Sequence, residues 1–347
     1  MISTDNARLT NIALHRVGNS MNEGSLHMSK DLIQLDSQLE SLMLSFFTKA
    51  FQSSEYFNLF HEEAIDNNLV YTAASSIFED KSTLFNQSII IAQHLFDKTT
   101  HPKIKDGELY VAYIEQMIVN GEEVDAVGIF KSESKDTFIQ IHLANDKYSI
   151  EPLEGINTNK LDKGCIIFNT EKDRGYIVAV VDNASRTGEA RFWRDDFLHI
   201  REHEDNYYHT QKVMKVYKDF VTEKLPDSFN VNKADQADFL NKSMTFFKEK
   251  EEFSMEDFKQ EVIAQPQIIE SFNEFIHEYE EENDTEVTDS FKIEENAVKK
   301  QSRVYKSVIK LDKNFHIYVH GRNDRIVKGF DEATGMHYYQ LYFKEEA

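Results

Sequence analysis

GELYVAYIEQMIVNGEEVDAVGIF, residues 107–130, is the stretch that decides the fold. It consists of two β-prone apolar runs, 107–119 and 124–130, on either side of Asn120-Gly121. Asn-Gly adopts positive φ at little cost, so two antiparallel strands can reverse there in a tight type I′ turn. Further β-type runs follow at residues 138–143, 164–169 and 176–181. Together these runs predict an antiparallel meander of about five strands, a common sheet size.

Helical periodicity precedes and follows this predicted sheet. Before it, apolar residues recur at helical intervals in 35–51, where Asp36 is a plausible N-cap, and in 68–78 and 82–95. After it, residues 207–224 and 233–250 carry apolar helical stripes, Ser254 with Asp257 forms a capping-box signature, and Pro266 opens a further helix. The helices that follow the sheet predict a helical bundle.

Short β-type runs between residues 304 and 343 close the chain, with a turn signal at Thr334-Gly335. The fold class is therefore predicted as α+β: an antiparallel β meander with N-terminal helices, then a helical bundle and a small C-terminal antiparallel sheet. A chain of 347 residues exceeds the usual size of one domain. We predict an α+β domain with the central sheet in residues 1–205, and a helical region with a C-terminal β meander in residues 206–347.

The composition restricts the class of protein. Sixty-one acidic residues against 39 Lys and Arg give a net charge of −22, which repels phosphates and anionic lipid unless basic groups are concentrated locally. Aromatic residues make up 12% of the chain, which argues against disorder. A single cysteine, Cys165, excludes an intrachain disulfide and fits a reducing cytosol. The sequence shows neither an export signal nor eighteen consecutive apolar residues, so we expect a cytoplasmic protein that does not enter a membrane.

Four common enzyme motifs do not occur in the sequence. It lacks a phosphate-binding G-x-x-x-x-G-K-[ST] or G-x-G-x-x-G loop, a G-x-S-x-G elbow and an H-E-x-x-H zinc motif. His199 and His203 lie four residues apart, and on a helix both could reach one metal ion. The zinc motif, however, needs Glu directly after the first His, so a solvated polar face is the preferred interpretation. We predict no catalytic residues, no metal site and no cofactor.

One spacing is typical of metal-dependent nucleases. Asp125 followed by Glu133-Ser134-Lys135 could supply two metal-binding carboxylates and a lysine near a scissile phosphate. Such a site needs the Glu-x-Lys on a strand with apolar neighbours. Residues 132–136 are all polar and lie where a turn between strands is expected, so the sequence favours a turn.

The sign of the charge reverses near residue 292. Residues 270–291 hold nine acids and no Lys or Arg, whereas residues 292–313 hold seven basic residues against three acids. Clustered Lys and Arg bind phosphates and release counterions, so this basic run is the candidate nucleic-acid-binding site. Ion pairing of the same bases with the acids of residues 270–289 is the structural alternative. The candidate residues are Lys299, Lys300, Arg303, Lys306, Lys310 and Lys313.

An ordered series of short motifs resembles the bacterial nucleoid-associated protein family, in the branch found in Bacteroidetes-type bacteria. The resemblance spans nearly the whole chain and implies a cytoplasmic protein that co-localises with the chromosome and catalyses no known step. The motifs are Ile12-Ala13-Leu14-His15, Gly107-Glu108-Leu109-Tyr110-Val111-Ala112-Tyr113, Leu161-Asp162-Lys163-Gly164, Lys233-Ala234-Asp235-Gln236, Phe315-His316-Ile317-Tyr318-Val319 and Phe330-Asp331-Glu332-Ala333-Thr334-Gly335.

Three functional hypotheses follow from the sequence. The first is a non-enzymatic nucleoid-associated protein that meets bacterial chromosomal DNA through the basic run, or through another DNA-bound nucleoid protein. The second is an acidic protein-interaction module or DNA mimic, in which residues 270–289 occupy the basic groove of a nucleic-acid-binding protein. The third is a nuclease-like enzyme that uses Asp125 and Glu133. A homo-oligomer formed through the apolar C-terminal strands is an additional expectation.

Overall fold

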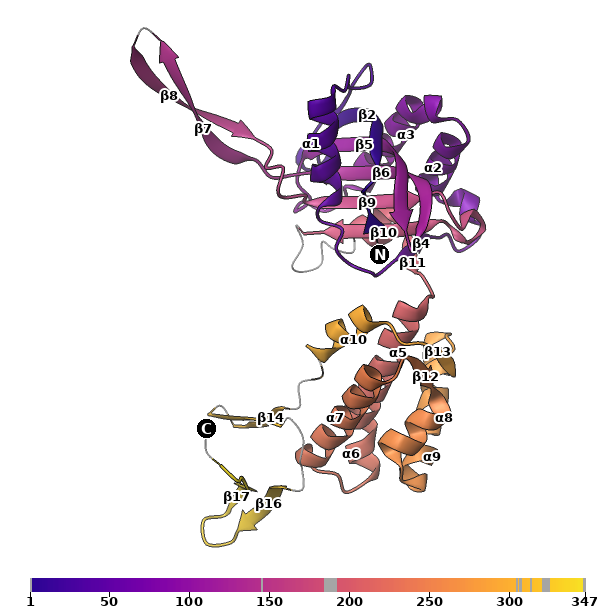
Figure 1. Ribbon diagram of the computed structural model, residues 1–347, viewed down its shortest axis with the longest axis vertical. Helices are drawn as coiled ribbons and strands as arrows, with labels where there is room; N and C mark the ends of the chain where they lie inside the picture. The colour runs from indigo at the N-terminus through magenta and orange to yellow at the C-terminus, as the bar shows by residue number, and fades with distance from the viewer. Residues whose placement is uncertain are drawn as a thin grey trace. The chain divides into compact units, whose positions relative to one another are not determined.

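A computed structural model describes residues 2–144, 146–183, 192–303, 305, 308–312, 314–319 and 325–345. Contacts divide the chain into two compact units, Met1–His203 (unit 1) and Glu204–Ala347 (unit 2). Unit 1 is built on a large antiparallel sheet, and unit 2 consists of helices with small antiparallel sheets (Figure 1). The α+β class predicted from the sequence is confirmed.

The sheet of unit 1 is antiparallel throughout its described pairings. Its strands lie in the order β11-β4-β10-β9-β6-β5-β2-β3, and β1 also pairs with β5. The predicted meander is formed by β5, β6, β9 and β10, each paired with the next. The bounds are β1 Ile2–Ser3, β2 Arg8–Val17, β3 Leu26–Met28, β4 Phe57–Leu59, β5 Gly107–Val119, β6 Glu122–Ser132, β9 Lys163–Phe168, β10 Ile177–Asp182 and β11 Ile200–Glu202.

Helices cover both faces of this sheet, because successive strand residues point to opposite sides. Helix α1, Ser37–Thr48, packs on one face, where the Phe47 ring stacks on Phe130 at 4.1 Å. Helices α2, Leu69–Glu79, and α3, Leu84–Lys98, pack on the other face together with Trp193, whose side chain is fully buried. The predicted N-cap Asp36 accepts a hydrogen bond from Leu39 N at 2.8 Å. Two apolar cores result, one on each face of the sheet.

The turn predicted at Asn120-Gly121 is confirmed, with φ values of 52° and 88°. One strand of the predicted meander is placed differently, however. The run at 138–143 forms part of β7, Asp136–Ala144, which pairs only with β8, Lys147–Gly155, outside the main sheet. The sequence analysis missed β8 because Pro152 and three charged residues interrupt its β-type pattern. In Figure 1 this hairpin extends away from the sheet.

Unit 2 is organised around a helical core rich in phenylalanine. Helix α5 continues through the π-helical turn Phe220–Lys224 into α6, and α8 continues into a second π-helical turn, Lys259–Ile263. Ser254 caps α8 and Pro266 opens α9, both as predicted. The helices are α5 Asn206–Asp219, α6 Leu225–Ser228, α7 Lys233–Glu249, α8 Met255–Phe258, α9 Pro266–Asn283 and α10 Glu295–Ser302.

Three two-stranded antiparallel sheets complete the described part of unit 2. The pair β12–β13 joins residues on either side of α8 and α9. The first C-terminal hairpin, β14–β15, packs Ile309 and Val319 against Ala234 and Ala237 of α7. The C-terminal β structure predicted from the sequence is therefore present. The strands are β12 Glu252–Ser254, β13 Ser290–Lys292, β14 Val308–Leu311, β15 Phe315–Tyr318, β16 Ile326–Asp331 and β17 Met336–Leu341.

Candidate nucleic-acid interface

Helix α10 carries three of the candidate residues at its C-terminal end. Ala297 and Val298 are buried against the core of unit 2, which turns Lys299 and Lys300 outward. Arg303 follows as the C-cap residue and is also exposed. Cations in the last turn interact favourably with the negative end of the helix dipole, so the same residues stabilise α10. The geometry thus brings three positive side chains to one helix end.

The two lysines of α10 make contacts at the surface of the protein. Lys299 Nζ lies 3.1 Å from Glu295 Oε2, and the two side chains are 71% and 85% exposed. Exposed pairs of this kind contribute about 0–1 kcal/mol. Lys300 Nζ lies 5.8 Å from the centre of the Tyr207 ring, within the range of a cation–π contact. Both lysines are therefore held in place without being enclosed.

Helix α5 holds α10 in position. Gln301 Nε2 donates to Gln211 Oε1 at 3.2 Å, and the buried Tyr305 hydroxyl donates to the carbonyl oxygen of Met214. Lys215, one turn beyond Gln211 on α5, is exposed. Residues four apart share a helix face, so Lys215 extends the side of α5 that contacts α10. The sequence places Lys215 off the apolar stripe of this helix but does not include it among the candidate site residues.

Other lysines of the region have different surroundings. Lys310 is exposed on β14, where it pairs across the hairpin with His316, and this hairpin packs on α7. Lys306 and Lys313 lie outside the described residues. Lys212 on α5 is buried, and its ammonium group donates to Thr285 Oγ1 and to the Glu286 carbonyl. The candidate site within the described residues is thus Lys299, Lys300 and Arg303, with Lys310 on a separate element.

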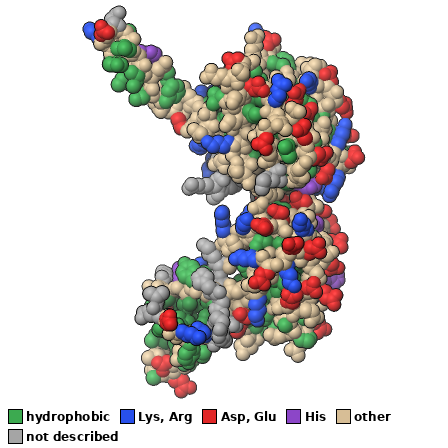
Figure 2. Space-filling view, viewed as in Figure 1, with side chains coloured by type: hydrophobic (Ala, Val, Ile, Leu, Met, Phe, Trp, Pro, Cys, Tyr) green, Lys and Arg blue, Asp and Glu red, His purple; other side chains and the backbone are tan. Residues whose placement is uncertain are grey.

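Acidic side chains gather on other elements of unit 2. Glu270, Glu274 and Glu278 are exposed along α9, and the Glu278 carboxylate lies 2.9 Å from Lys224 Nζ. Among the described ion pairs, Glu278 of α9 pairs with Lys224, whereas Lys299 of α10 pairs with Glu295 of the same helix. Figure 2 shows Lys and Arg side chains over α10 and α5, whereas Asp and Glu predominate over α8 and β13. The exposed cations of α10 and the exposed row of acids on α9 therefore lie on different elements of unit 2.

The nuclease-like residues do not converge. Asp125 accepts hydrogen bonds from the Tyr113 hydroxyl at 2.7 Å and from Gln116 N at 3.3 Å. Glu133 lies eight residues further along, directly after the end of β6, and at about 3.3 Å per residue the two Cα atoms are roughly 26 Å apart. Lys135 pairs with Glu108 instead. One metal ion cannot bridge side chains so far apart.

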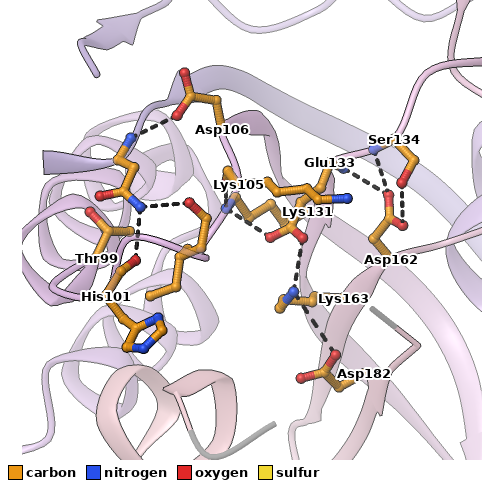
Figure 3. A network of polar contacts seen from close by, with 12 residues as sticks. Thr99, His101, Lys105, Asp106, Lys131, Glu133, Ser134, Asp162, Lys163 and Asp182 are labelled. Atoms are coloured by element: carbon orange, nitrogen blue, oxygen red, sulfur yellow. Dashed lines mark hydrogen bonds and ion pairs between the residues drawn. The ribbon is translucent and has the colours of Figure 1, made fainter. Parts of the chain in front are cut away.

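Glu133 has a different role from the exposed turn residue that the sequence predicts. Its side chain is 3% exposed and lies between two buried lysines (Figure 3). Oε1 lies 2.9 Å from Lys131 Nζ, and Oε2 lies 2.9 Å from Lys163 Nζ. Lys163 is also 3.9 Å from Asp182, and Lys131 donates to the Lys105 carbonyl at 2.6 Å. Burial lowers the pKa of Lys131, and the nearby Glu133 charge opposes that shift.

Asp162 fixes the backbone of the same connection. Its Oδ2 accepts from the backbone N–H groups of Glu133 at 2.7 Å and Ser134 at 3.0 Å. Its Oδ1 accepts from Ser134 Oγ at 3.0 Å (Figure 3). The polar segment 132–136 does connect two strands, as predicted, but it does so as part of a buried network that ties β6 to β9.

The two histidines considered for a metal lie apart. His199 has a φ of 51° and β11 follows it, so the helical geometry required by an i, i+4 site is not formed. Four extended residues separate the two Cα atoms by about 13 Å. His199 Nε2 contacts Glu62 Oε1 at 3.1 Å, and the buried His203 Nδ1 contacts Asn58 Oδ1 at 3.0 Å. Within the described residues, no group of three or more His, Cys, Asp or Glu is arranged to hold a metal ion.

These features define a class of protein: an acidic two-unit α+β protein whose described polar clusters are structural and whose helix α10 carries exposed cations at its C-terminal end. A family model described as Nucleoid-associated protein YejK matches residues 13–335, and the chain belongs to this family. Membership supports a nucleoid-associated role. No curated protein matches the chain. Of the helices in the described ranges, none is both long enough and apolar enough to span a membrane.

Proposed function

We propose that this protein is a non-enzymatic, cytoplasmic component of the bacterial nucleoid that contacts chromosomal DNA directly through α10. Lys299, Lys300 and Arg303 form the contact, and Lys310 with the undescribed Lys306 and Lys313 extends it. The observation that carries the proposal is the exposure of the α10 cations on an element other than the acidic helix α9. Family membership supplies the nucleoid context.

The proposed contact is electrostatic and reads no base sequence. Each phosphate that a lysine or arginine neutralises loses its condensed counterions, and this release contributes about −0.9 to the slope of log K against log salt. At physiological salt and above, affinity for a DNA duplex should therefore fall steeply with salt, and it should be similar for unrelated sequences. Fluorescence anisotropy of labelled duplexes at several salt concentrations measures both properties.

The decisive variant is Lys300→Glu with Arg303→Glu. It should weaken binding to all duplexes alike and reduce the magnitude of the salt slope by roughly 2. Lys103→Glu with Lys248→Glu is the matched control, because both residues are exposed and the net charge changes by the same amount. Equal affinity of wild type and the α10 variant would remove this helix from the function. Equal losses in both variants would show that only net charge matters.

Exposed carboxylates on α9 support a second candidate function. Glu270, Glu274 and Glu278 lie four residues apart along the eighteen-residue helix and all face solvent. Such a row fits an acidic interaction module or DNA mimic that occupies the basic groove of a nucleic-acid-binding protein. In that case a partner should remain bound after nuclease treatment, and Glu270→Lys with Glu274→Lys should release it. The α10 variant should then retain the partner.

A further inference from the structure

The hairpin β7–β8 has one apolar and one mainly polar face. Cross-strand partners lie on the same face, and successive residues alternate between faces. The pairs Ile139–Pro152, Ile141–Ile150 and Leu143–Tyr148 therefore share one face. These six residues are named the apolar strip. The opposite face carries Gln140 with Glu151 and His142 with Ser149, and His142 Nε2 lies 3.6 Å from Glu151 Oε2.

The apolar strip is open to solvent. Its five large side chains are between 60% and 76% exposed, values that core residues of the sheet never approach. None of the strip residues belongs to the apolar cores formed by the described residues. Figure 2 shows hydrophobic side chains along this hairpin, which extends away from unit 1 in Figure 1. A two-stranded sheet without a packing partner is marginally stable in water, so we expect another apolar surface to cover the strip.

We infer that the apolar strip is a self-association surface, and that a second copy of this chain covers it. Two strips packed face to face about a two-fold axis form a four-stranded sandwich, in which each copy contributes the same residues. Each strip offers about 500 Å² of apolar area when its side chains are counted at typical values for buried hydrophobic residues. Two strips together reach the ~1,000 Å² that a specific interface requires.

Charge favours a second copy over nucleic acid as the occupant. The apolar strip contains no cation, so it offers nothing to a phosphate. The chain as a whole is strongly acidic, but the strip also contains no acid, so two copies can approach there without burying like charges. The C-terminal hairpins also expose apolar side chains, including Phe315 and Met336.

Self-association would also matter for the proposed DNA contact. A dimer carries two copies of α10, and the second contact with one DNA molecule then becomes intramolecular. The self-association surface does not depend on that proposal, however, because its residues lie in unit 1 and are not basic.

Sedimentation velocity of the full chain tests the inference. At concentrations on the order of 1–100 μM, a range that populates a micromolar dimer, we expect a mass that rises to twice the chain mass of 40.5 kDa. Ile141→Lys with Ile150→Lys places two ammonium groups at the centre of the strip and should weaken self-association by roughly 100-fold or more. His142→Lys with Ser149→Lys, on the opposite face of the same hairpin, should leave it unchanged.

A cross-linking experiment shows directly which face of the β7–β8 hairpin lies between two copies. Packed sheets lie about 10 Å apart, so a short bismaleimide should join two copies of Ile141→Cys but not two copies of His142→Cys. The natural Cys165 is fully buried and should not react in the folded protein. A wild-type mass that stays at 40.5 kDa overturns the inference and leaves the strip to a different kind of partner. So does a dimer that survives the strip substitutions, or equal cross-linking of both cysteine variants.

Discussion

Removing the negative charge of Glu133 should destabilise unit 1 far more than its place in a polar loop suggests. The substitution Glu133→Gln keeps the size of the side chain but leaves the ammonium groups of Lys131 and Lys163 without their shared carboxylate. These two lysines are 0% and 3% exposed, so water cannot replace the lost partner. Breaking a buried ion pair from one side costs about 3–5 kcal/mol.

An exposed carboxylate of the same unit provides the reference. Glu108 pairs with Arg16 at 3.0 Å and with Lys135 at 3.3 Å, but the two cations are 46% and 44% exposed. Glu108→Gln should therefore cost about 0–1 kcal/mol. For a unit of about 200 residues, the Glu133 substitution should lower Tm by roughly 10 °C and the Glu108 substitution by only a few degrees.

The difference between wild type and the Glu133 variant should depend on pH. Burial already lowers the pKa of Lys131 in the folded protein, and Glu133 opposes that effect. Without Glu133 the folded-state pKa falls further, whereas the unfolded-state value stays near 10.5. Between the two values the unfolded chain binds the extra proton, so stability rises with pH. The difference in free energy of unfolding between wild type and Glu133→Gln should therefore become smaller as the pH is raised toward 10.

Trp193 makes the measurement specific to unit 1. It is the single tryptophan of the chain, it is fully buried, and its indole N–H donates to the Gly164 carbonyl beside Lys163. Its fluorescence during urea unfolding reports the free energy of this unit. A loss for Glu133→Gln no larger than for Glu108→Gln would refute the account of a buried network. Restoration by Lys131→Met, Glu133→Leu, Lys163→Met and Asp182→Asn together would support it, because all four charges of the network are then removed.

Two further predictions concern backbone strain and thiol reactivity. Gly121 and Gly175 have φ values of +88° and +97°, but a Cβ at Gly121 meets nothing within 4 Å, whereas one at Gly175 lies 2.0 Å from the Leu59 oxygen. Gly121→Ala should lower the free energy of unfolding in urea by about 1 kcal/mol, from backbone strain alone. Gly175→Ala should lower it by at least ~2 kcal/mol more, because its Cβ overlaps the Leu59 carbonyl. Equal losses in the two variants would contradict this overlap. Burial raises the pKa of the Cys165 thiol, so it should react with a chromogenic disulfide reagent only after unfolding, and rapid native reaction would contradict its position.

Local sequence signals were sufficient to predict most of the helices and strands. The Asn120-Gly121 turn, the N-cap Asp36 and the helix-opening Pro266 act through residues next to them, and the structure places each as predicted. The three-residue strands β4 and β11 could not be predicted, since neither is long enough to show a period. The position of β11 depends on its pairing with β4, and the position of β4 depends on its pairing with β10 as well.

The burial of Glu133 and Lys212 illustrates what local patterns omit. Both side chains look like surface residues in the sequence, and both are buried because partners far along the chain receive them. For Glu133 the second lysine comes thirty residues later, from the neighbouring strand β9. For Lys212 the acceptors come from residues 285 and 286, over seventy residues away. By contrast, the outward position of Lys299 and Lys300 follows from the helical period of α10 alone.

The total charge and the α10 cations act over different distances, and this separates direct DNA contact from recruitment. The Debye length is about 8 Å at physiological salt and about 30 Å at 0.01 M. At physiological salt a phosphate beside Lys300 responds mainly to nearby charges, whereas at low salt it also responds to the net charge of −22. Direct contact should therefore give an affinity maximum at intermediate salt, with counterion release weakening it above and overall repulsion weakening it below. Purified protein that binds DNA at no salt concentration would leave recruitment by a DNA-bound partner as the route to the nucleoid.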